Sequence, residues 1–473
     1  MNEEFWNNDD EDYGSLEDLL SAYFSMKEEG TKHYFDVDDY EAIIDYLFQN
    51  NREIEALEAC EYGLNFFPNS EILLLLHAEI LFQSQKFKQA LNILDQIEEA
   101  NPTYIDAIIL RTDIYISQLK APLAAEYIQE RLHQFESKEQ IDLLFQLADI
   151  YDEVEEYEKV FDTLKKILEI NPYIEEALHK ISFWADFEGL HDQSIELHKK
   201  LLDDDPFNAL AWFNIGASYQ AKKEYKNAIE AYEYCVAIDD KYELAYRNLA
   251  DAYIRLNWYE KAIESLERNL EFGNPEDVIF EALGHCFEKQ KDFEKARYFY
   301  RKAIELSPNE DGIFYRIGNT YLREKEWEKA VKSFSTALQI NKENANYYLA
   351  LGNALIELEA YNEALLCFYN ALKIKPHNIT NWNAIIKLLI IMEEYESALE
   401  QIEMANDLLG DRADFNYFKT AALLNLGKSK EALIYFEMAL DTSVQKLKVI
   451  LELEPDLLQR KPFAQLVARY KKK

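Results

Sequence analysis

Small residues recur along this sequence at a fixed step of 34 residues. Seven alanines keep the step without interruption from Ala228 to Ala432, and glycines keep it at Gly284, Gly318 and Gly352. Aromatic residues and six of the ten prolines keep the same step at two other phases. A period of about 20 to 50 residues is typical of repeat architectures, in which each unit packs on its neighbours in the sequence. The period therefore constrains the fold more strongly than any local propensity.

The step divides residues 37–446 into twelve repeats of 34 residues, except that the third has 36. The repeats begin at residues 37, 71, 105, 141, 175, 209, 243, 277, 311, 345, 379 and 413. Residues 1–14 are acidic and poor in apolar residues, so we expect a disordered tail there. Because the outer faces of terminal repeats have no neighbour, residues 15–36 are expected to form an N-terminal capping helix, and residues 447–473 C-terminal capping helices with a basic tail.

Each repeat is predicted to be a pair of helices joined by a short turn. In the ninth repeat, apolar residues recur at steps of three and four residues over 311–323 and again over 326–338, which is the helical period. Pro308 marks the end of the second helix in the repeat before it, because the residue preceding a proline is pushed out of the α region. Glycine and proline number only 12 and 10, which does not suit a turn-rich β architecture.

The repeats resemble the tetratricopeptide repeat family, whose pattern is W-x2-L-G-x2-Y, then A-x3-F, then P. The sixth and eighth repeats carry much of this pattern, in Trp212, Ile215, Gly216, Tyr219, Ala228 and Tyr232, and in Phe280, Leu283, Gly284, Phe287, Ala296, Tyr300 and Pro308. The resemblance implies an all-α fold, a right-handed superhelical α-solenoid of about twelve 34-residue helix-turn-helix repeats with capping helices. It also implies a concave groove, lined mainly by the first helix of each repeat, that binds proteins or peptides.

A glycine at the eighth place of a repeat lies inside the first helix, where it costs about 1 kcal/mol relative to alanine. We expect a closer approach of the two helices to outweigh this cost at Gly318, with Ala330 of the second helix nearby. Gly318 is thus interpreted as a packing residue, and its neighbour Asn319 as a residue that points into the groove.

Catalytic and metal-binding motifs are not found in the sequence. It has no glycine-rich phosphate loop, no GxSxG and no HExxH, and its four cysteines form no CxxC pair. Three histidines, His179, His191 and His198, lie within twenty residues of each other in the fifth repeat. His191 and His198 occupy places that hold packing aromatics in other repeats, so a packing role is favoured over a metal site. We therefore expect no catalytic residue, no metal and no cofactor.

The second, fifth, ninth and twelfth places of the first helix lie on one stripe, which the resemblance implies is the groove face. In the N-terminal half this stripe is acidic, at Asp45, Glu79, Asp113, Asp149 and Asp152. In the C-terminal half the candidates for peptide binding are Asn319, Asn353, Tyr315, Leu349, Ile356, Asn383 and Lys387. An asparagine amide offers a donor and an acceptor, which suits the main chain of an extended peptide. The alternative is that asparagine is merely common at this place in the family.

The net charge of −39 argues against a nucleic-acid partner, because phosphates would be repelled along most of the surface. No stretch of about 18 residues is apolar and uncharged, so no membrane insertion is expected, and the start does not resemble a signal peptide. We therefore expect a cytoplasmic, non-enzymatic scaffold or adaptor that binds an extended peptide or helix of a protein with basic segments. The alternatives are a regulatory or substrate-presenting subunit of a separately encoded enzyme, or a self-associating structural protein, although a homo-oligomer is not predicted.

Overall fold

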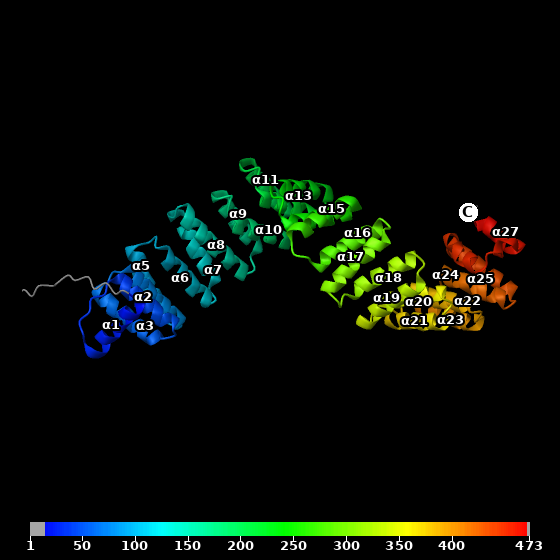
Figure 1. The fold of residues 1–473 in the computed structure, drawn as a ribbon, viewed down its shortest axis with the longest axis horizontal. Helices are drawn as coiled ribbons and strands as arrows, with labels where there is room; N and C mark the ends of the chain where they lie inside the picture. The colour runs from blue at the N-terminus through cyan, green and yellow to red at the C-terminus, as the bar shows by residue number, and fades with distance from the viewer. Residues whose placement is uncertain (1–14, 471–473) are drawn as a thin grey trace, which may run out of the picture. The chain divides into compact units, whose positions relative to one another are not determined.

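The computed structural model describes residues 15–470, so the expected acidic tail at 1–14 and the last residues of the basic tail, 471–473, lie outside the described residues. The described chain contains 27 α-helices, three short 3-10 helices and no β-strand. Figure 1 shows helices that are neighbours in the sequence lying side by side, as α8 and α9 do. Contacts divide the chain into two compact units, residues 1–239 and 240–473.

The first compact unit contains α1 (Leu16–Glu29), α2 (Val37–Gln49), α3 (Glu53–Phe66), α4 (Glu71–Gln83), α5 (Phe87–Ala100), α6 (Ile105–Ser117), α7 (Ala121–Arg131), η1 (Leu132–Gln134), α8 (Ser137–Glu153), α9 (Tyr157–Ile170), α10 (Glu175–Phe187), α11 (His191–Asp204), α12 (Ala209–Ala221) and α13 (Tyr225–Ile238).

The second compact unit contains α14 (Glu243–Arg255), α15 (Tyr259–Phe272), α16 (Asp277–Lys289), α17 (Phe293–Leu306), α18 (Asp311–Arg323), α19 (Trp327–Ile340), α20 (Ala345–Glu357), α21 (Tyr361–Ile374), α22 (Ile379–Ile391), α23 (Tyr395–Leu409), α24 (Ala413–Asn425), α25 (Ser429–Thr442), η2 (Val444–Leu447), α26 (Lys448–Leu453), η3 (Leu457–Gln459) and α27 (Lys461–Tyr470).

The helices pack almost entirely on their neighbours in the sequence. The two helices of a repeat contact each other, as α18 and α19 do, and each second helix contacts the first helix of the next repeat within its compact unit, as α19 and α20 do. Several first helices also contact the next first helix, for example α18 with α20 and α22 with α24. The expected all-α solenoid is confirmed by this pattern of helices and contacts.

The turn between the two helices of a repeat has the same geometry in all twelve repeats. In the ninth, the N–H of Glu326 donates to the carbonyl of Tyr321 at 2.9 Å, and the N–H of Lys325 donates to that of Leu322 at 3.3 Å. This is a Schellman motif, which places its C′ residue in the left-handed region, and Lys325 has φ 62°. Only Gly189 and Gly427 supply a glycine for this place. Residues with side chains fill the other turns: Asn51, Gln85, Leu119, Glu155, Lys223, Asn257, Lys291, Lys325, Glu359 and Glu393.

The glycines at the eighth place of four repeats make room for an aromatic ring. A Cβ on Gly216 would lie 2.5 Å from the Tyr232 ring, and a Cβ on Gly318 would collide with the ring of Phe334. The sequence led us to expect Ala330 near Gly318; the atoms nearest to Gly318 belong instead to the larger Phe334, one helical turn further along α19. The four pairs are Gly216–Tyr232, Gly284–Tyr300, Gly318–Phe334 and Gly352–Phe368.

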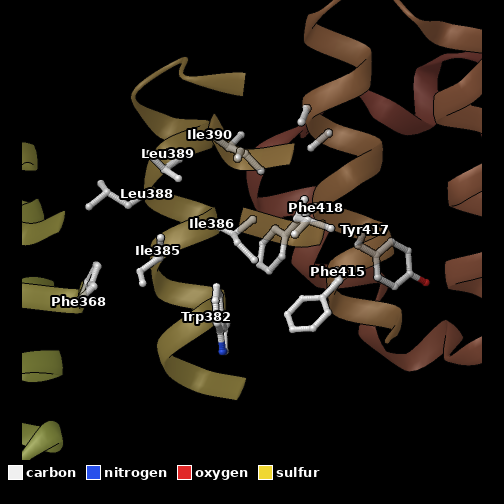
Figure 2. Close-up of a cluster of buried hydrophobic side chains, with 14 of the residues drawn as sticks. Phe368, Trp382, Ile385, Ile386, Leu388, Leu389, Ile390, Phe415, Tyr417 and Phe418 are labelled. Atoms are coloured by element: carbon white, nitrogen blue, oxygen red, sulfur yellow. The ribbon is translucent and has the colours of Figure 1, made fainter. Parts of the chain in front are cut away.

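The core of the second compact unit is continuous through its last repeats. Figure 2 shows Trp382 and Ile386 of α22 and Phe415 and Phe418 of α24, all of them buried, in the space between these two helices. The indole Nε1 of Trp382 donates to the carbonyl of Pro376 at 2.8 Å, so this buried tryptophan also has its polar atom satisfied. This hydrogen bond joins the tryptophan of one repeat to the proline that ends the repeat before it.

Candidate functional site

The acidic stripe consists of Asp45, Glu79, Asp113, Asp149 and Asp152, which lie on α2, α4, α6 and α8 of the first compact unit. Polar contacts run between neighbouring first helices along it. Gln146 of α8 donates from Nε2 to Asp113 of α6 at 2.8 Å, and Nζ of Lys180 of α10 lies 3.3 Å from Asp149. These contacts place Asp113 and Asp149 where neighbouring first helices meet.

The carboxylates at the start of the stripe are poorly compensated. Burial raises the pKa of Asp45, and burial together with the charges of Asp45 and Asp106 raises the pKa of Glu79. Burial also raises the pKa of Asp113, although the hydrogen bond from Gln146 opposes this effect. Within residues 15–470, no ion pair joins Asp45 or Glu79 to a basic side chain. Asp45 and Asp106 thus lie near enough to Glu79 for their charges to disfavour its anionic form.

The two asparagines expected to bind a peptide lie on helices that contact each other, Asn319 on α18 and Asn353 on α20. Asn319 is half-buried and Asn353 is exposed. In the described part of the chain neither side-chain amide has a hydrogen-bond partner. Both amides are therefore available to a ligand.

The apolar candidates in the same region are more tightly packed than an open groove would require. The ring of Tyr315 lies 4.9 Å from that of Tyr347 and 5.7 Å from that of Phe334, measured between centroids. Leu349 and Ile356 are half-buried and pack against the same core. These three side chains consequently form the edge of the core, and each presents only part of its surface to a ligand.

The remaining candidates, Asn383 and Lys387, lie on α22 beside the C-terminal segment of the chain. Nζ of Lys387 pairs with Glu452 of α26 at 2.7 Å, and α26 packs on α24. Tyr417 of α24 is fully buried and donates from its hydroxyl to the carbonyl of Ser443 at 2.9 Å. Oδ1 of Asn383 is buried and has no hydrogen-bond partner among the described residues. The C-terminal segment thus already neutralises Lys387, which spacing within a repeat could not reveal because the two partners are 65 residues apart.

The histidines of the fifth repeat form no metal site. His198 is fully buried, with Nδ1 2.7 Å from the carbonyl of Ser194 and Nε2 3.0 Å from Nδ2 of Asn214. The neighbours assign the proton to Nδ1, which donates to the carbonyl, while Nε2 accepts from the amide. Burial lowers the pKa of His198 to about 4. Across residues 15–470, no group of three His, Cys, Asp or Glu side chains is placed to hold a metal ion.

An aromatic cluster in the fourth and fifth repeats was not among the expected site residues. Trp184 and Phe187 of α10 contact the ring of Tyr157, the first residue of α9, and the neighbouring Phe183 contacts both of these α10 rings. Phe183 and Phe187 leave 61% and 58% of their surface exposed. The signal was present in the sequence, because Phe183 holds the ninth place that is acidic in the four repeats before it.

Comparison with known families identifies the repeats. Two models of tetratricopeptide repeat protein 21 match, its ARM repeat over residues 25–123 and its C-terminal ARM domain over residues 218–333. Three models of the tetratricopeptide repeat itself match residues 188–243, 318–359 and 345–378. The chain belongs to the tetratricopeptide repeat family.

Solved tetratricopeptide repeat structures resemble this chain at low identity. YrrB, described as a TPR protein with an unusual peptide-binding site, is 20% identical, with a TM-score of 0.36 over 40% of this chain and 96% of its own. Cut9–Hcn1 of the APC/C is 15% identical, with a TM-score of 0.36 over 88% and 92%. A tetratricopeptide repeat protein from Parabacteroides merdae is 16% identical, with a TM-score of 0.39 over 52% and 98%. No curated protein matches the sequence significantly.

Tetratricopeptide repeat proteins generally act by binding other proteins, and families built on this scaffold are generally not enzymes. Within the described residues, no helix is long and apolar enough to span a bilayer.

Proposed function

We propose that this tetratricopeptide repeat protein is a non-enzymatic, cytoplasmic scaffold or adaptor without a cofactor. On this proposal it binds an extended peptide or helix of a partner protein on the face formed by the first helices of its repeats. The bound segment carries lysine or arginine where it passes the acidic stripe. The observation that carries the proposal is the crowding of Asp45, Glu79 and Asp106 without a neutralising cation.

The energetic argument starts from the raised pKa values. A carboxylate whose anionic form is penalised by burial and by neighbouring anions gains more from a cation than an isolated, hydrated carboxylate does. A basic segment would therefore lower the pKa of Glu79 and of Asp45 on binding. Added salt screens such attraction, with a Debye length of about 8 Å at physiological ionic strength, so we expect affinity to fall as salt rises.

The amides of Asn319 and Asn353 support a second contact with the same kind of ligand. Each has an unused donor and an unused acceptor, and their helices are neighbours. An extended main chain offers N–H and C=O groups that match such amides, with no requirement on its side chains. In this proposal the asparagines contribute affinity, whereas the acidic stripe contributes selection for basic sequences.

In-cell crosslinking and pull-down with mass spectrometry tests the proposal. We would compare the natural chain with a variant carrying Asp113→Lys and Asp149→Lys, and with a second carrying Asn319→Ala and Asn353→Ala. A matched control reverses two exposed acidic residues of the second helix α9, Asp162→Lys and Glu169→Lys, and changes the net charge by the same amount. The proposal is supported by partners whose binding weakens as salt rises and is lost in the Asp113→Lys/Asp149→Lys variant but is kept in the control variant. Partners that survive both test variants, or crosslink only to second helices, would contradict it.

A further inference from the structure

The aromatic cluster Tyr157, Trp184, Phe183 and Phe187 is unusual for a surface. The rings of Tyr157 and Trp184 are stacked, with centroids 5.1 Å apart and planes at 17°, and Phe187 meets Tyr157 edge-on at 5.0 Å. Phe183 and Phe187 stack at 6.2 Å. These contacts hold each ring in place, so the exposed faces of Phe183 and Phe187 form a preorganised apolar platform.

Carboxylates lie near Tyr157, the ring on which this platform packs, and on α10 itself. The pKa of Tyr157 is raised by desolvation and by the nearby carboxylates of Glu155, Asp152 and Glu188. Asp186 is exposed on α10 between Phe183 and Phe187, one residue from the latter. Asp152 belongs to the acidic stripe, so one carboxylate of the stripe lies near Tyr157.

The combination of exposed rings and carboxylates selects among ligands. A purely apolar segment would cover the rings but would strip water from the carboxylates without replacing their hydrogen bonds, which is unfavourable. An acidic segment would be repelled. A guanidinium group stacks flat on an aromatic ring while its N–H donors reach carboxylates at the edge, and it is more weakly hydrated than an ammonium group.

We propose that this platform is the anchoring site for an arginine of a basic partner segment, whose guanidinium stacks on Phe183 or Phe187 and pairs with the nearby carboxylates. The inference rests on the proposed binding of basic segments and adds a preference for arginine over lysine. A second copy of the chain is a poor occupant, because each copy carries a net charge of −39 and the two acidic surfaces would repel each other.

The test uses the full chain and three labelled 12-residue peptides of glycine and serine that carry three arginines, three lysines or three leucines. Fluorescence anisotropy measures their affinities for the natural chain and for Phe183→Ala/Phe187→Ala. The matched control is Tyr173→Ala/Phe207→Ala, which removes two exposed rings that follow Pro172 and Pro206 in the adjoining turns. Because Phe183 and Phe187 are exposed, removing them opens no core cavity, and circular dichroism checks that the helices remain.

We expect the arginine peptide to bind more tightly than the lysine peptide. The Phe183→Ala/Phe187→Ala variant should weaken binding of the arginine peptide by about twofold to fivefold, as expected for the loss of an exposed cation–π contact, and should change the affinity for the lysine peptide less. The control variant should change neither affinity.

Four results would overturn the inference. Equal binding of both basic peptides, unaffected by the loss of the rings but weakened by Asp113→Lys/Asp149→Lys, would leave the proposed function intact and remove the arginine anchor. Tighter binding of the leucine peptide would make the platform an apolar docking site. Self-association in sedimentation equilibrium that the Phe183/Phe187 variant abolishes would assign the platform to a second copy. Binding of none of the peptides would overturn both the anchor and the basic-partner part of the proposed function.

Discussion

The ring of Tyr300 lies directly against the α-carbon of Gly284, so that a Cβ on Gly284 would stand 2.5 Å from ring carbon Cδ1. The fully buried tyrosine also donates from its hydroxyl to Glu288 at 2.7 Å, which fixes the ring. Glycine is therefore required here by the size of its partner, and the same partnership recurs in three other repeats.

Replacing Gly284 by alanine should destabilise the chain by about 1 to 2 kcal/mol, because the strain of overpacking exceeds the helix-propensity gain of about 1 kcal/mol. Gly312→Ala is the matched control, since a Cβ there meets nothing within 4 Å, and it should be neutral or stabilising. Urea denaturation followed by circular dichroism measures both. Adding Tyr300→Leu to Gly284→Ala should recover part of the loss, because Ala250 and Leu266 occupy these two places in the seventh repeat. If Gly284→Ala were as stable as Gly312→Ala, the packing account would be wrong.

The turns make a separate prediction. Leu119 has φ 58° and is 90% exposed, so its side chain contributes little packing while its backbone conformation is unfavourable. Leu119→Gly should raise the free energy of unfolding by about 0.5 to 1 kcal/mol, since the left-handed cost of about 1 to 2 kcal/mol exceeds the entropic cost of glycine. Gly427→Ala, at φ 78°, should lower it by about 1 kcal/mol. Thermal denaturation of both variants checks the opposite signs, and changes of the same sign in the two variants would contradict the prediction.

Buried His198 predicts a local dependence of stability on pH. Its pKa is about 4 in the folded chain, below the ordinary value of 6.5, so the unfolded state binds the proton first as the pH falls. The contribution of neutral, buried His198 to the free energy of unfolding is complete above about pH 6.5 and is lost progressively towards pH 4. About 1 kcal/mol of it is lost between pH 7.5 and 5.5. Hydrogen exchange of the α11 amides at these two values of pH measures this loss locally. His198→Leu, which places there the residue that the fourth repeat has in Leu164, should remove the dependence, and an unchanged slope in that variant would exclude His198 as its source.

Glu79 of the acidic stripe predicts a pH dependence of stability opposite in sign to that of His198. The pKa of Glu79 is raised in the folded chain, so its ionisation destabilises the fold at neutral pH, and this penalty disappears as the pH falls below the unfolded pKa. Glu79→Gln should therefore raise the melting temperature at pH 7 and have a smaller effect at pH 4. Glu224, whose pKa is lowered by hydrogen bonds from Lys222 and Asn227, is the control, because Glu224→Gln should not be stabilising. Equal effects of Glu79→Gln at both values of pH would count against a charge effect.

Much of the fold can be predicted from the sequence, because the same local patterns recur in every repeat. The 34-residue step, the helical period and the prolines that end second helices are properties of short segments, and short segments determine the helices of a solenoid. The contact of Gly318 with Phe334 was missed because both Ala330 and Phe334 lie on the inner side of α19, and only the packed structure decides which is nearer. The covariation of glycine with a large aromatic sixteen residues later, as in Gly216 and Tyr232, was a usable signal.

The candidate site is less predictable than the fold. Exposure and partners depend on residues far away in the sequence, as with Lys387 and Glu452. The availability of Asn319 and Asn353, and the compensation of Asp149 by Lys180, likewise depend on what neighbouring repeats place beside them. The aromatic cluster required three-dimensional information, because Tyr157 belongs to a different repeat from Trp184.

The packing of α26 on α24 has a consequence for how such a chain can change its length. Interior repeats contact only similar repeats. If one whole repeat in the middle of the chain were duplicated, each copy would therefore still pack against repeats of the same kind. The end of the array differs, because residues beyond the last repeat contact particular residues within the repeats. The hydroxyl of Tyr417 donates to the backbone carbonyl of Ser443 within the last repeat, and Lys387 of the eleventh repeat pairs with Glu452, which lies beyond the last repeat. A duplication of residues 413–446 would keep Tyr417 and Ser443 together in each copy, but it would insert 34 residues between Lys387 and Glu452 and separate this pair, so the ion pair ties the C-terminal segment to one position in the array.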